Sequence, residues 1–221
     1  MEDVINYLRK VRRGTMFLIE GPSGIGKGTV IKEILARDPN IRFSISATTR
    51  PQRNTEQNGV DYYFISDEKY NQLVKEDAFY EYVDSQYGNR YGTLRSEVDK
   101  FINVGEDVIF DLDWMGARQM KEKAGADVVT IYLMPPSIKE VRKRLEGRQT
   151  DSAEVIEKRM GMILEKLSHW NEFDYVVVNQ DLEDTVEKIR RIISGERMKK
   201  VRQMEGLTTL VNDLIKEAKK A

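Results

Sequence analysis

The sequence predicts an α/β fold in which a parallel sheet is covered by helices on both faces. Short apolar runs alternate with amphipathic stretches along most of the 221 residues. Two of these runs, 107–113 and 127–134, have no polar alternation at their centres, as is typical of buried parallel strands. A glycine-rich segment, 21–29, lies between an apolar strand and a helix, an arrangement that suits phosphate binding.

The strands are assigned from apolar runs and from alternation. Segment 15–20 is apolar and lies directly before the glycine-rich segment, and 41–49 is a second strand candidate. Segments 60–65 and 78–84 alternate and carry aromatic residues, which favours antiparallel strands. They form an aromatic patch inserted into the α/β pattern. The expected strands are 15–20, 41–49, 60–65, 78–84, 107–113, 127–134 and 174–179.

The helices are assigned from amphipathic stretches and from their end signals. Ser66 precedes two acidic residues, as the cap of a short helix would. Gly105 ends another amphipathic stretch, and a polar segment separates two more near residue 150. The expected helices are 29–38, 66–76, 96–105, 137–148, 153–170 and 182–194.

Composition excludes several classes of protein. The formal net charge is −1, so global charge does not favour nucleic acid as a partner. Cys is absent and His169 is the only His, which excludes disulfides and argues against a histidine metal site or triad. His169 is expected to be structural. No apolar run approaches the roughly 18 residues that cross a membrane. The acidic N-terminus fits neither a secretory signal nor a transit peptide, so we expect a cytoplasmic setting.

One domain is expected over 1–195, followed by a helical extension over 196–221. Apolar residues at helical spacing in the extension suit packing on the domain or on a second subunit. Both a monomer and a homo-oligomer are compatible with this pattern. The expected parts of the domain are a core of 14–42 and 96–195, an insertion of about 43–95 and a lid of about 144–159.

The pattern Gly-x-x-x-x-Gly-Lys over 21–27 predicts a phosphate-binding loop. Because it joins a strand directly to a helix, backbone N–H groups at the helix N-terminus would wrap a phosphate. Lys27 would reach the terminal phosphates. The residues expected to bind ATP here are Gly21, Pro22, Ser23, Gly24, Ile25, Gly26, Lys27, Gly28 and Thr29.

Gly28 departs from the usual loop, in which a Ser or Thr hydroxyl at this position ligates Mg²⁺. Thr29 comes one residue later and would point elsewhere on the helix. Since Mg²⁺ readily keeps several waters, phosphates and water can hold it without the hydroxyl. The spelling Lys27-Gly28-Thr29 is familiar from adenylate kinases, and it favours nucleoside monophosphate kinases over switch GTPases.

A second phosphate site is expected in the insertion. Arg50 and Arg53 are three residues apart in a polar segment, and their guanidinium forks match phosphate oxygens. Ser46 and Tyr62 can add neutral donors. Taken alone, the two arginines would fit a solvated basic loop equally well.

Further charged residues lie near the expected carboxyl edge of the sheet. Asp111 and Asp113 are two residues apart at the end of a strand, so both are expected on one face, where open α/β sheets bind ligands. Arg144 and Arg148 are four apart on one helix face, and Arg159 follows a polar segment. Such cations suit phosphoryl transfer, in which charge spreads over the phosphoryl oxygens.

Several motifs in order resemble the guanylate kinase family: "SISATTRPQR", "NGVDYYF", "FYEYVD", "YGNRYGT", "DLDWMGAR", "RLEGR" and "DYVVVNQDL". The resemblance covers about 14–195. It implies a phosphate-loop kinase core, a small mixed GMP-binding insertion and a helical lid. It also implies transfer of the γ-phosphoryl of ATP to GMP, with Mg²⁺, in purine nucleotide metabolism. GMP would be the acceptor and dGMP a second candidate, with neither nucleic acid nor membrane as partner.

The resemblance assigns roles to individual residues. A carboxylate such as Glu81 can accept from both N1–H and the exocyclic amine of guanine. Asp111 is the candidate to hold Mg²⁺ through a water, and no direct protein ligand of the metal is assigned. The implied GMP-binding residues are Ser46, Arg50, Arg53, Tyr62, Glu81, Tyr91, Thr93 and Asp113. The implied catalytic residues are Lys27, Arg50, Arg148 and Arg159, and Arg144 and Asn179 would add to the ATP site.

Two rival functions follow from the same residues. The spelling of the loop fits an adenylate kinase, against which the base site argues. Guanylate-kinase-like domains of scaffold proteins bind phosphopeptides and tend to lose the phosphate loop, whereas this chain keeps Gly26 and Lys27. A comparison of turnover with GMP and with AMP distinguishes a guanylate kinase from an adenylate kinase. A measurement of ATP binding distinguishes the enzyme from a scaffold binding module.

Overall fold

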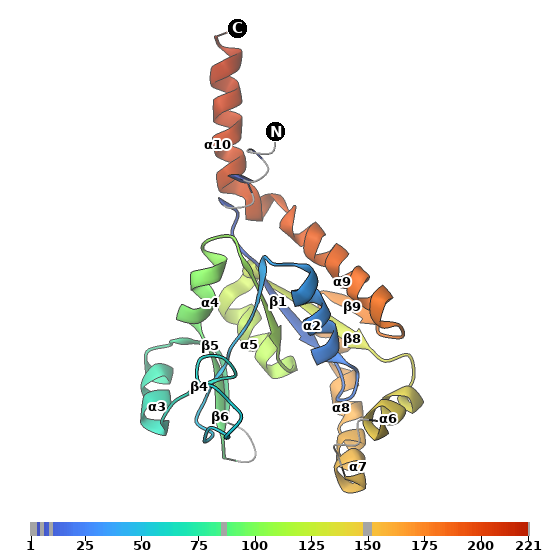
Figure 1. The fold of residues 1–221 in the computed structure, drawn as a ribbon. Helices are drawn as coiled ribbons and strands as arrows, with labels where there is room; N and C mark the ends of the chain where they lie inside the picture. Colours follow the sequence, from blue (N-terminus) through green and yellow to red (C-terminus); the bar gives the residue numbers. More distant parts are fainter. Residues whose placement is uncertain (1–3, 5–6, 9–10, 85–87, 148–151, 221) are drawn as a thin grey trace.

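A five-stranded parallel sheet forms the centre of the molecule (Figure 1). The computed structural model describes residues 4, 7, 8, 11–84, 88–147 and 152–220. The strand order is β2-β7-β1-β8-β9, and each neighbouring pair is parallel. The predicted α/β class with a parallel sheet is therefore confirmed. The strands are β1 (Met16–Glu20), β2 (Ile41–Phe43), β7 (Asp107–Asp111), β8 (Val128–Met134) and β9 (Tyr175–Val178).

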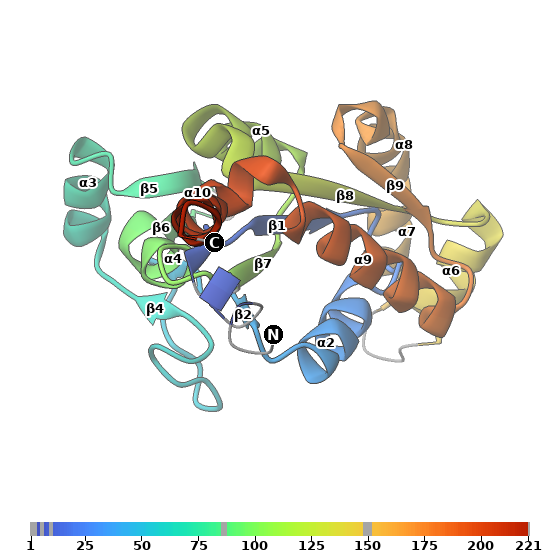
Figure 2. The same cartoon turned by 90° about the horizontal axis from the view of Figure 1, so that it is seen from above.

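Helices cover both faces of this sheet, as Figure 2 shows from above. Side chains of β1 alternate between the two cores: Phe17 and Ile19 pack with α2 (Lys27–Arg37) and α9 (Leu182–Arg197). Met16 and Leu18 pack against α4 (Arg95–Ile102) and α5 (Trp114–Ala124). Because both faces of β1 are buried, its sequence is continuously apolar until Glu20.

The insertion forms a second sheet, ordered β4-β3-β6-β5, with α3 (Asp67–Lys75) beside it. Its strands are β3 (Ala47–Thr48), β4 (Tyr63–Phe64), β5 (Phe79–Asp84) and β6 (Arg90–Leu94). As predicted, Ser66 caps α3, and its hydroxyl accepts from the Lys69 N–H at 3.2 Å.

Two predictions about this sheet are wrong. The single strand expected over 41–49 is two strands, β2 and β3, in two different sheets. The apolar alternation continues across the change of sheet, so it could not mark the break. The segment 60–65 was expected to be antiparallel, but β4 pairs parallel with β3 because the chain crosses over between them. Segment 78–84 is the antiparallel strand β5, as expected, but its partner β6 was not predicted.

Three helices, α6 (Ile138–Glu146), α7 (Ala153–Gly161) and α8 (Ile163–Ser168), form an arm on the other side of the core. The single helix expected over 153–170 is therefore wrong, because the chain breaks at Met162. Ile156 and Ile163, seven residues apart, both pack against Val141 and Leu145 of α6. The helix expected over 137–148 ends at Glu146, with Gly147 as its C-cap, and Arg148 lies outside the described residues.

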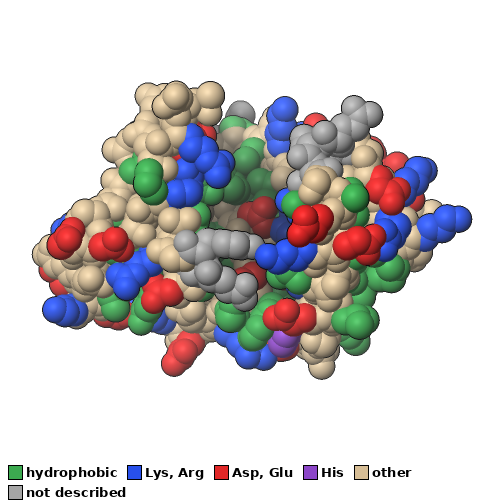
Figure 3. Space-filling model, turned by 90° about the horizontal axis from the view of Figure 1, so that it is seen from below, with side chains coloured by type: hydrophobic (Ala, Val, Ile, Leu, Met, Phe, Trp, Pro, Cys, Tyr) green, Lys and Arg blue, Asp and Glu red, His purple; other side chains and the backbone are tan. Residues whose placement is uncertain are grey.

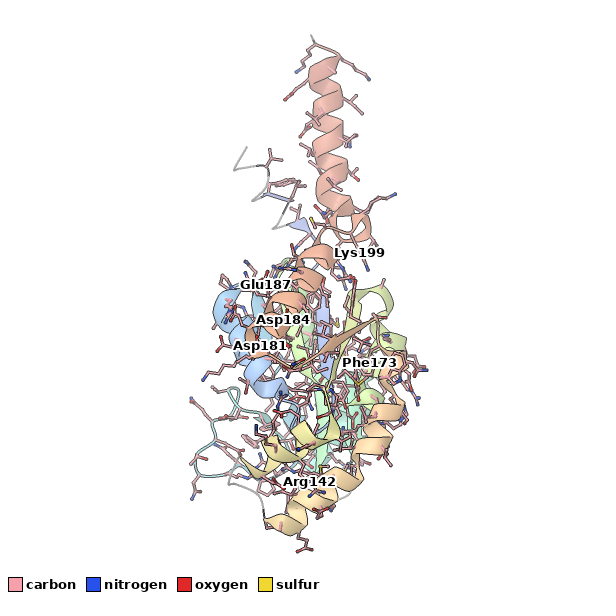
Figure 4. The ribbon with its side chains drawn as sticks, turned by 90° about the vertical axis from the view of Figure 1, so that its right-hand side faces the viewer. Arg142, Phe173, Asp181, Asp184, Glu187 and Lys199 are labelled. Carbon is pink, nitrogen blue, oxygen red and sulfur yellow. The ribbon has the colours of Figure 1, made fainter. Side chains whose placement is uncertain are left out.

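The last helix, α10 (Lys200–Ala218), extends away from the body of the molecule (Figures 1 and 4). Figure 4 labels Lys199 at the turn between α9 and α10. Gly206 of α10 lies against Leu8 and Val11, where a Cβ would meet Val11 Cγ2 at 2.5 Å. Among the described residues, we find no helix that combines the length and apolar character required to cross a membrane.

A buried group of charges joins the start of the extension to the core. Asp107 is fully buried at the start of β7, and its two oxygens accept from Arg12 at 2.7 and 2.9 Å. Arg197 also donates to Asp107 at 2.7 Å and to Asp38 at 2.7 Å. Arg202 donates to the carbonyl of Ala126 at 2.9 Å. The first residues of the proposed extension, 196–221, thus contribute to the packing of the domain.

Replacing Arg197 by Met should lower the free energy of unfolding by about 1.5–3 kcal/mol, because Asp107 stays buried and loses a charged donor. Urea unfolding followed by circular dichroism measures this loss. Arg191→Met is the matched control, since Arg191 lies on the same helix with a side chain 76% exposed. The control should change stability by less than about 0.5 kcal/mol. Equal losses in the two variants would contradict a stabilising role for the buried charges.

Candidate active site

The glycine-rich loop leads from the central strand β1 into α2. Gly26 is the N-cap of α2 and has a φ of 99°, a left-handed conformation that favours glycine. At Gly24, a Cβ would lie 2.8 Å from Cγ of Leu145, so α6 packs closely on the loop. The loop therefore presents its backbone N–H groups at a helix N-terminus, where a phosphate is favoured.

Lys27 lies across this loop. Its Nζ donates to the carbonyl of Gly21 at 2.9 Å and lies 3.8 Å from Oδ1 of Asp111. Asp111 ends β7, beside β1 in the sheet. Burial raises the pKa of Asp111, and Lys27 opposes that rise.

Two side chains assigned to the ATP site brace the loop from behind. Arg144 of α6 donates to the carbonyl of Ile25 at 3.1 Å and to that of Asn179 at 3.2 Å. Asn179 donates to the same Ile25 carbonyl at 2.6 Å and accepts from Thr185 at 3.0 Å. Asn179 is buried, and its side chain contacts the backbone of the loop.

Gly28 lies in the first turn of α2 on the exposed side. Its φ is not positive, and a Cβ built there would have no heavy atom within 4 Å. Thr29 is also exposed. Neither the backbone angle nor the neighbouring helices therefore oppose a hydroxyl side chain at position 28.

A buried ion pair beside the loop was not predicted from the sequence. Glu20, at the end of β1, is 2% exposed, and Lys166 of α8 donates to it at 3.0 Å. Burial raises the pKa of Glu20, and Lys27 and Lys166 oppose this. An acidic residue ending an apolar strand was a usable signal for Glu20. Lys166 is 146 residues away in the chain and had no such signal.

Arg50, Tyr62 and Tyr91 of the insertion lie close together. The guanidinium of Arg50 lies 5.4 Å from the centre of the Tyr62 ring, and the rings of Tyr62 and Tyr91 are 6.0 Å apart. Glu56, which was not predicted, accepts from Arg50 at 2.7 Å. Arg53 is exposed in the same segment.

A cavity of about 180 Å³ separates the insertion from the sheet edge. Ser46 and Tyr62 line it on the insertion side, and Asp111 and Leu112 line it on the core side. Figure 3 shows this end of the molecule, which is hollowed between the insertion and the helical arm. A ligand held at Ser46 and Tyr62 would therefore face the strand end that also faces Lys27.

Glu81, Thr93 and Asp113 come together at the base of the insertion. Glu81 and Thr93 are paired residues of β5 and β6, and Thr93 Oγ1 donates to Glu81 Oε1 at 2.7 Å. Glu81 is 4% exposed, and burial raises its pKa to about 7. The Thr93 hydrogen bond lowers this pKa, and the charge of Asp113 raises it.

The arrangement of Asp111 and Asp113 differs from the prediction. The strand expected over 107–113 ends at Asp111, so the two carboxylates do not share one strand face. Asp113 is instead the N-cap of α5 and accepts from the Gly116 N–H at 3.0 Å. The charge of Asp113 raises the pKa of Glu81, while Asp111 lies near Lys27.

Arg159 is half-buried on α7, and Arg148 lies outside the described residues. His169 stacks on Trp114 at 3.9 Å and is hydrogen-bonded to Glu172, consistent with the structural role expected for it. In the described part of the chain, no three acidic or histidine side chains are grouped to hold a metal.

A phosphate loop at the edge of a parallel sheet, flanked by an insertion and a helical arm, defines a phosphate-loop nucleotide kinase. The family model described as "Guanylate kinase" matches residues 13–196. The chain therefore belongs to the guanylate kinase family.

Several known proteins are similar to this chain. The guanylate kinase of Zymomonas mobilis is 43% identical over 207 residues, which cover 94% of this chain and 95% of the relative. That of Novosphingobium aromaticivorans is 44% identical, covering 93% and 92%. The crystal structure of guanylate kinase from Anaplasma phagocytophilum superposes with a TM-score of 0.67 at 32% identity, covering 86% and 90%. The resemblance stated from the motifs is thus confirmed.

The raised pKa of Glu81 predicts a pH-dependent cost of folding. A carboxyl with a pKa of 4.5 when unfolded and about 7 when folded favours folding fully below 4.5. That contribution is lost as pH rises toward 7, because the ionised form is disfavoured in the folded state. The free energy of unfolding of Glu81→Gln, relative to that of the parent, should therefore increase by about 2–3 kcal/mol when the pH is raised from 5 to 8. Urea unfolding at both pH values tests this, and a pH-independent difference would contradict the shift.

Proposed function

We propose that this chain transfers the γ-phosphoryl of ATP to GMP, giving ADP and GDP. The observation that carries the proposal is the buried carboxylate of Glu81, which lies with Thr93 in the insertion and close to Asp113 of the core. Family membership supports the same reaction. Relatives named guanylate kinase match nearly the whole chain.

The base site suits guanine because of its hydrogen-bonding groups. Guanine offers two adjacent donors, N1–H and the exocyclic amine, to which one carboxylate can accept. Adenine offers an acceptor at N1 and would be repelled by ionised Glu81. Guanine donors would lower the pKa of Glu81 from about 7, so binding stabilises the ionised carboxylate. Thr93 now donates to Glu81 and would have to share or redirect its hydroxyl to reach O6.

The phosphate of GMP would lie at Arg50, Tyr62 and Tyr91, with Ser46 nearby. Arg50 and the exposed Arg53 provide guanidinium groups whose forks match phosphate oxygens. This phosphate is already anionic, so the transfer needs no general base. Because the proposed contacts go to base and phosphate, dGMP is a second acceptor.

On the ATP side, the loop backbone and Lys27 would hold the phosphates. Lys27 would leave the carbonyl of Gly21 for a phosphate oxygen. Arg144 would keep the loop in place through Ile25, and Arg148 and Arg159 would add positive charge from the arm. Catalysis would then consist mainly of positioning and of stabilising charge on the transferring group. Closure of insertion and arm would exclude water and so favour transfer over hydrolysis.

The residues present fit Mg²⁺ held mainly by ATP. Mg²⁺ is commonly bound by one or two carboxylates together with substrate phosphates and waters. The side chain of Asp111 is 40% exposed at the strand end near Lys27, so it can hold a metal-bound water. Bound there, Mg²⁺ would neutralise charge on the phosphate oxygens.

The proposed function is tested by a coupled assay with ATP, Mg²⁺ and a panel of nucleoside monophosphates. We expect turnover with GMP and at least about a hundredfold lower efficiency with AMP, as base sites that reject unmatched hydrogen-bonding groups achieve. Lys27→Met should lower turnover at least about a hundredfold, because no other loop side chain replaces its charge. Preference for AMP would support the adenylate kinase alternative, and the absence of both turnover and ATP binding would support a binding module.

Gly28→Ser should add a hydroxyl without loss of fold, because the position is helical and open. Activity should survive, and the Mg²⁺ concentration for half-maximal rate should fall or stay level, since the hydroxyl can replace one water. Steady-state rates across a Mg²⁺ titration measure this. Gly28→Ala is the matched control, because it adds a Cβ without a hydroxyl and gains about 1 kcal/mol in helix propensity, somewhat more than serine gains. A serine variant that binds ATP normally yet needs much more Mg²⁺ would refute the idea that water fills the missing position.

A further inference from the structure

Glu56 lies at the centre of the basic segment that is proposed to bind the GMP phosphate. Its Oε1 accepts from Arg50 at 2.7 Å, and its Oε2 accepts from the backbone N–H of Arg53 at 2.9 Å. The side chains of Arg50 and Glu56 are 12% and 13% exposed. One carboxylate therefore connects both arginine positions of the segment.

A carboxylate so placed allows two opposite interpretations. Glu56 can act as a stand-in for the GMP phosphate, which the substrate must displace. It can also be a fixed brace, which holds the guanidinium in the geometry that the phosphate needs. The first interpretation requires Glu56 to move away, and the second requires it to stay.

The contacts of Glu56 favour the fixed brace. Its backbone N–H donates to the carbonyl of Arg53 at 3.0 Å, and its carbonyl accepts from Gln52 at 2.6 Å. The side chain and main chain of Glu56 thus close the same short turn, 53–56. Moving the carboxylate away would break its hydrogen bond to the Arg53 N–H as well as its pair with Arg50.

The remaining contacts of Arg50 leave part of its guanidinium available. One nitrogen donates to Glu56 and the other terminal nitrogen donates to the carbonyl of Pro51 at 2.9 Å. The rings of Tyr62 and Phe64 lie 5.4 and 5.7 Å from its central carbon. Since a guanidinium has five N–H donors, these contacts fix its plane and still leave donors for a phosphate.

We propose that Glu56 is a positioning residue, which orients Arg50 for the phosphate of the acceptor nucleotide. The inference rests on the proposed function, because it assumes that GMP is the acceptor. Its contribution is the ordering of a long side chain before binding, which otherwise costs entropy when the ligand arrives. Glu56 itself would not touch the phosphate, since two anions would repel.

Binding of GMP and of guanosine to Glu56→Gln tests the inference. The Kd for GMP should rise about three- to tenfold, the cost of ordering one free side chain. The Kd for guanosine should change less than about twofold, because guanosine has no phosphate and Glu81 holds the base. Isothermal titration measures both. Glu76→Gln is the matched control, since Glu76 is an exposed carboxylate of the same insertion that pairs with Gln72 and with no arginine.

A double variant shows whether Glu56 acts through Arg50. In an Arg50→Lys background, the flat guanidinium is gone, and Glu56→Gln should weaken GMP by less than about twofold further. An unchanged effect of Glu56→Gln in that background would overturn the inference. If Glu56→Gln does not fold, Glu56→Asp replaces it, because the shorter carboxylate keeps the charge and cannot reach both partners.

The other possible outcomes of the Glu56→Gln experiment also decide whether Glu56 is a positioning residue. A lower Kd for GMP in Glu56→Gln would mean that Glu56 competes with the phosphate, and an equal loss of GMP and guanosine would mean a general collapse of the insertion. Both results overturn the inference. If the parent protein binds GMP but does not phosphorylate it, the proposed function fails, and the ratio of the two dissociation constants still decides the role of Glu56.

Discussion

The burial of β1 between β7 and β8 is the constraint on which the rest of the structure depends. Phe17, Leu18 and Ile19 are fully buried, so the strand cannot shift without exposing a core on one face or the other. Its end fixes where the loop begins, and its pairing with β7 sets Asp111 beside that loop. Chemistry at this edge is therefore positioned by apolar packing several residues away.

Opposite charges are paired throughout the site before any nucleotide arrives. Lys27 faces Asp111, Lys166 faces Glu20, and Arg50 faces Glu56. Such pairing lets cations lie close together without mutual repulsion, and it limits how strongly the site attracts anions in general. Binding energy then depends on whether a phosphate can use donors that the carboxylates leave available. This favours ligands of matching geometry over free anions.

Local patterns predicted those parts of the molecule that local chemistry determines. The loop from Gly21 to Lys27, the cap at Ser66 and the buried run of β8 follow from spacing and residue type alone. Resemblance to the family supplied the grouping of Glu81, Thr93 and Asp113, which come from three separate elements. Spacing misplaced Asp113, because a carboxylate two residues past a strand can become a helix cap instead of continuing the pleat.

Long-range contacts explain what could not be predicted. The pair of Glu20 and Lys166 exists only because α8 folds back over the end of β1, and no spacing in the sequence expresses that contact. The parallel pairing of β4 with β3 depends likewise on the path of a polar loop. The segment 153–170 is helical in composition, yet the structure interrupts it at Met162.

Strand β7 begins at Asp107, which pairs with two arginines, and ends at Asp111, which lies near Lys27 of the phosphate loop. Four residue steps from Asp107 to Asp111 correspond to about 13 Å of extended chain. That distance exceeds the range within which substitutions usually influence one another's free energies, roughly 7–10 Å. Substitutions at Arg12 or Arg197 and substitutions at Lys27 should therefore have additive effects on the free energy of unfolding. Substitutions at the amino end of the sheet can then change the stability of the protein without changing the reaction at its carboxyl end.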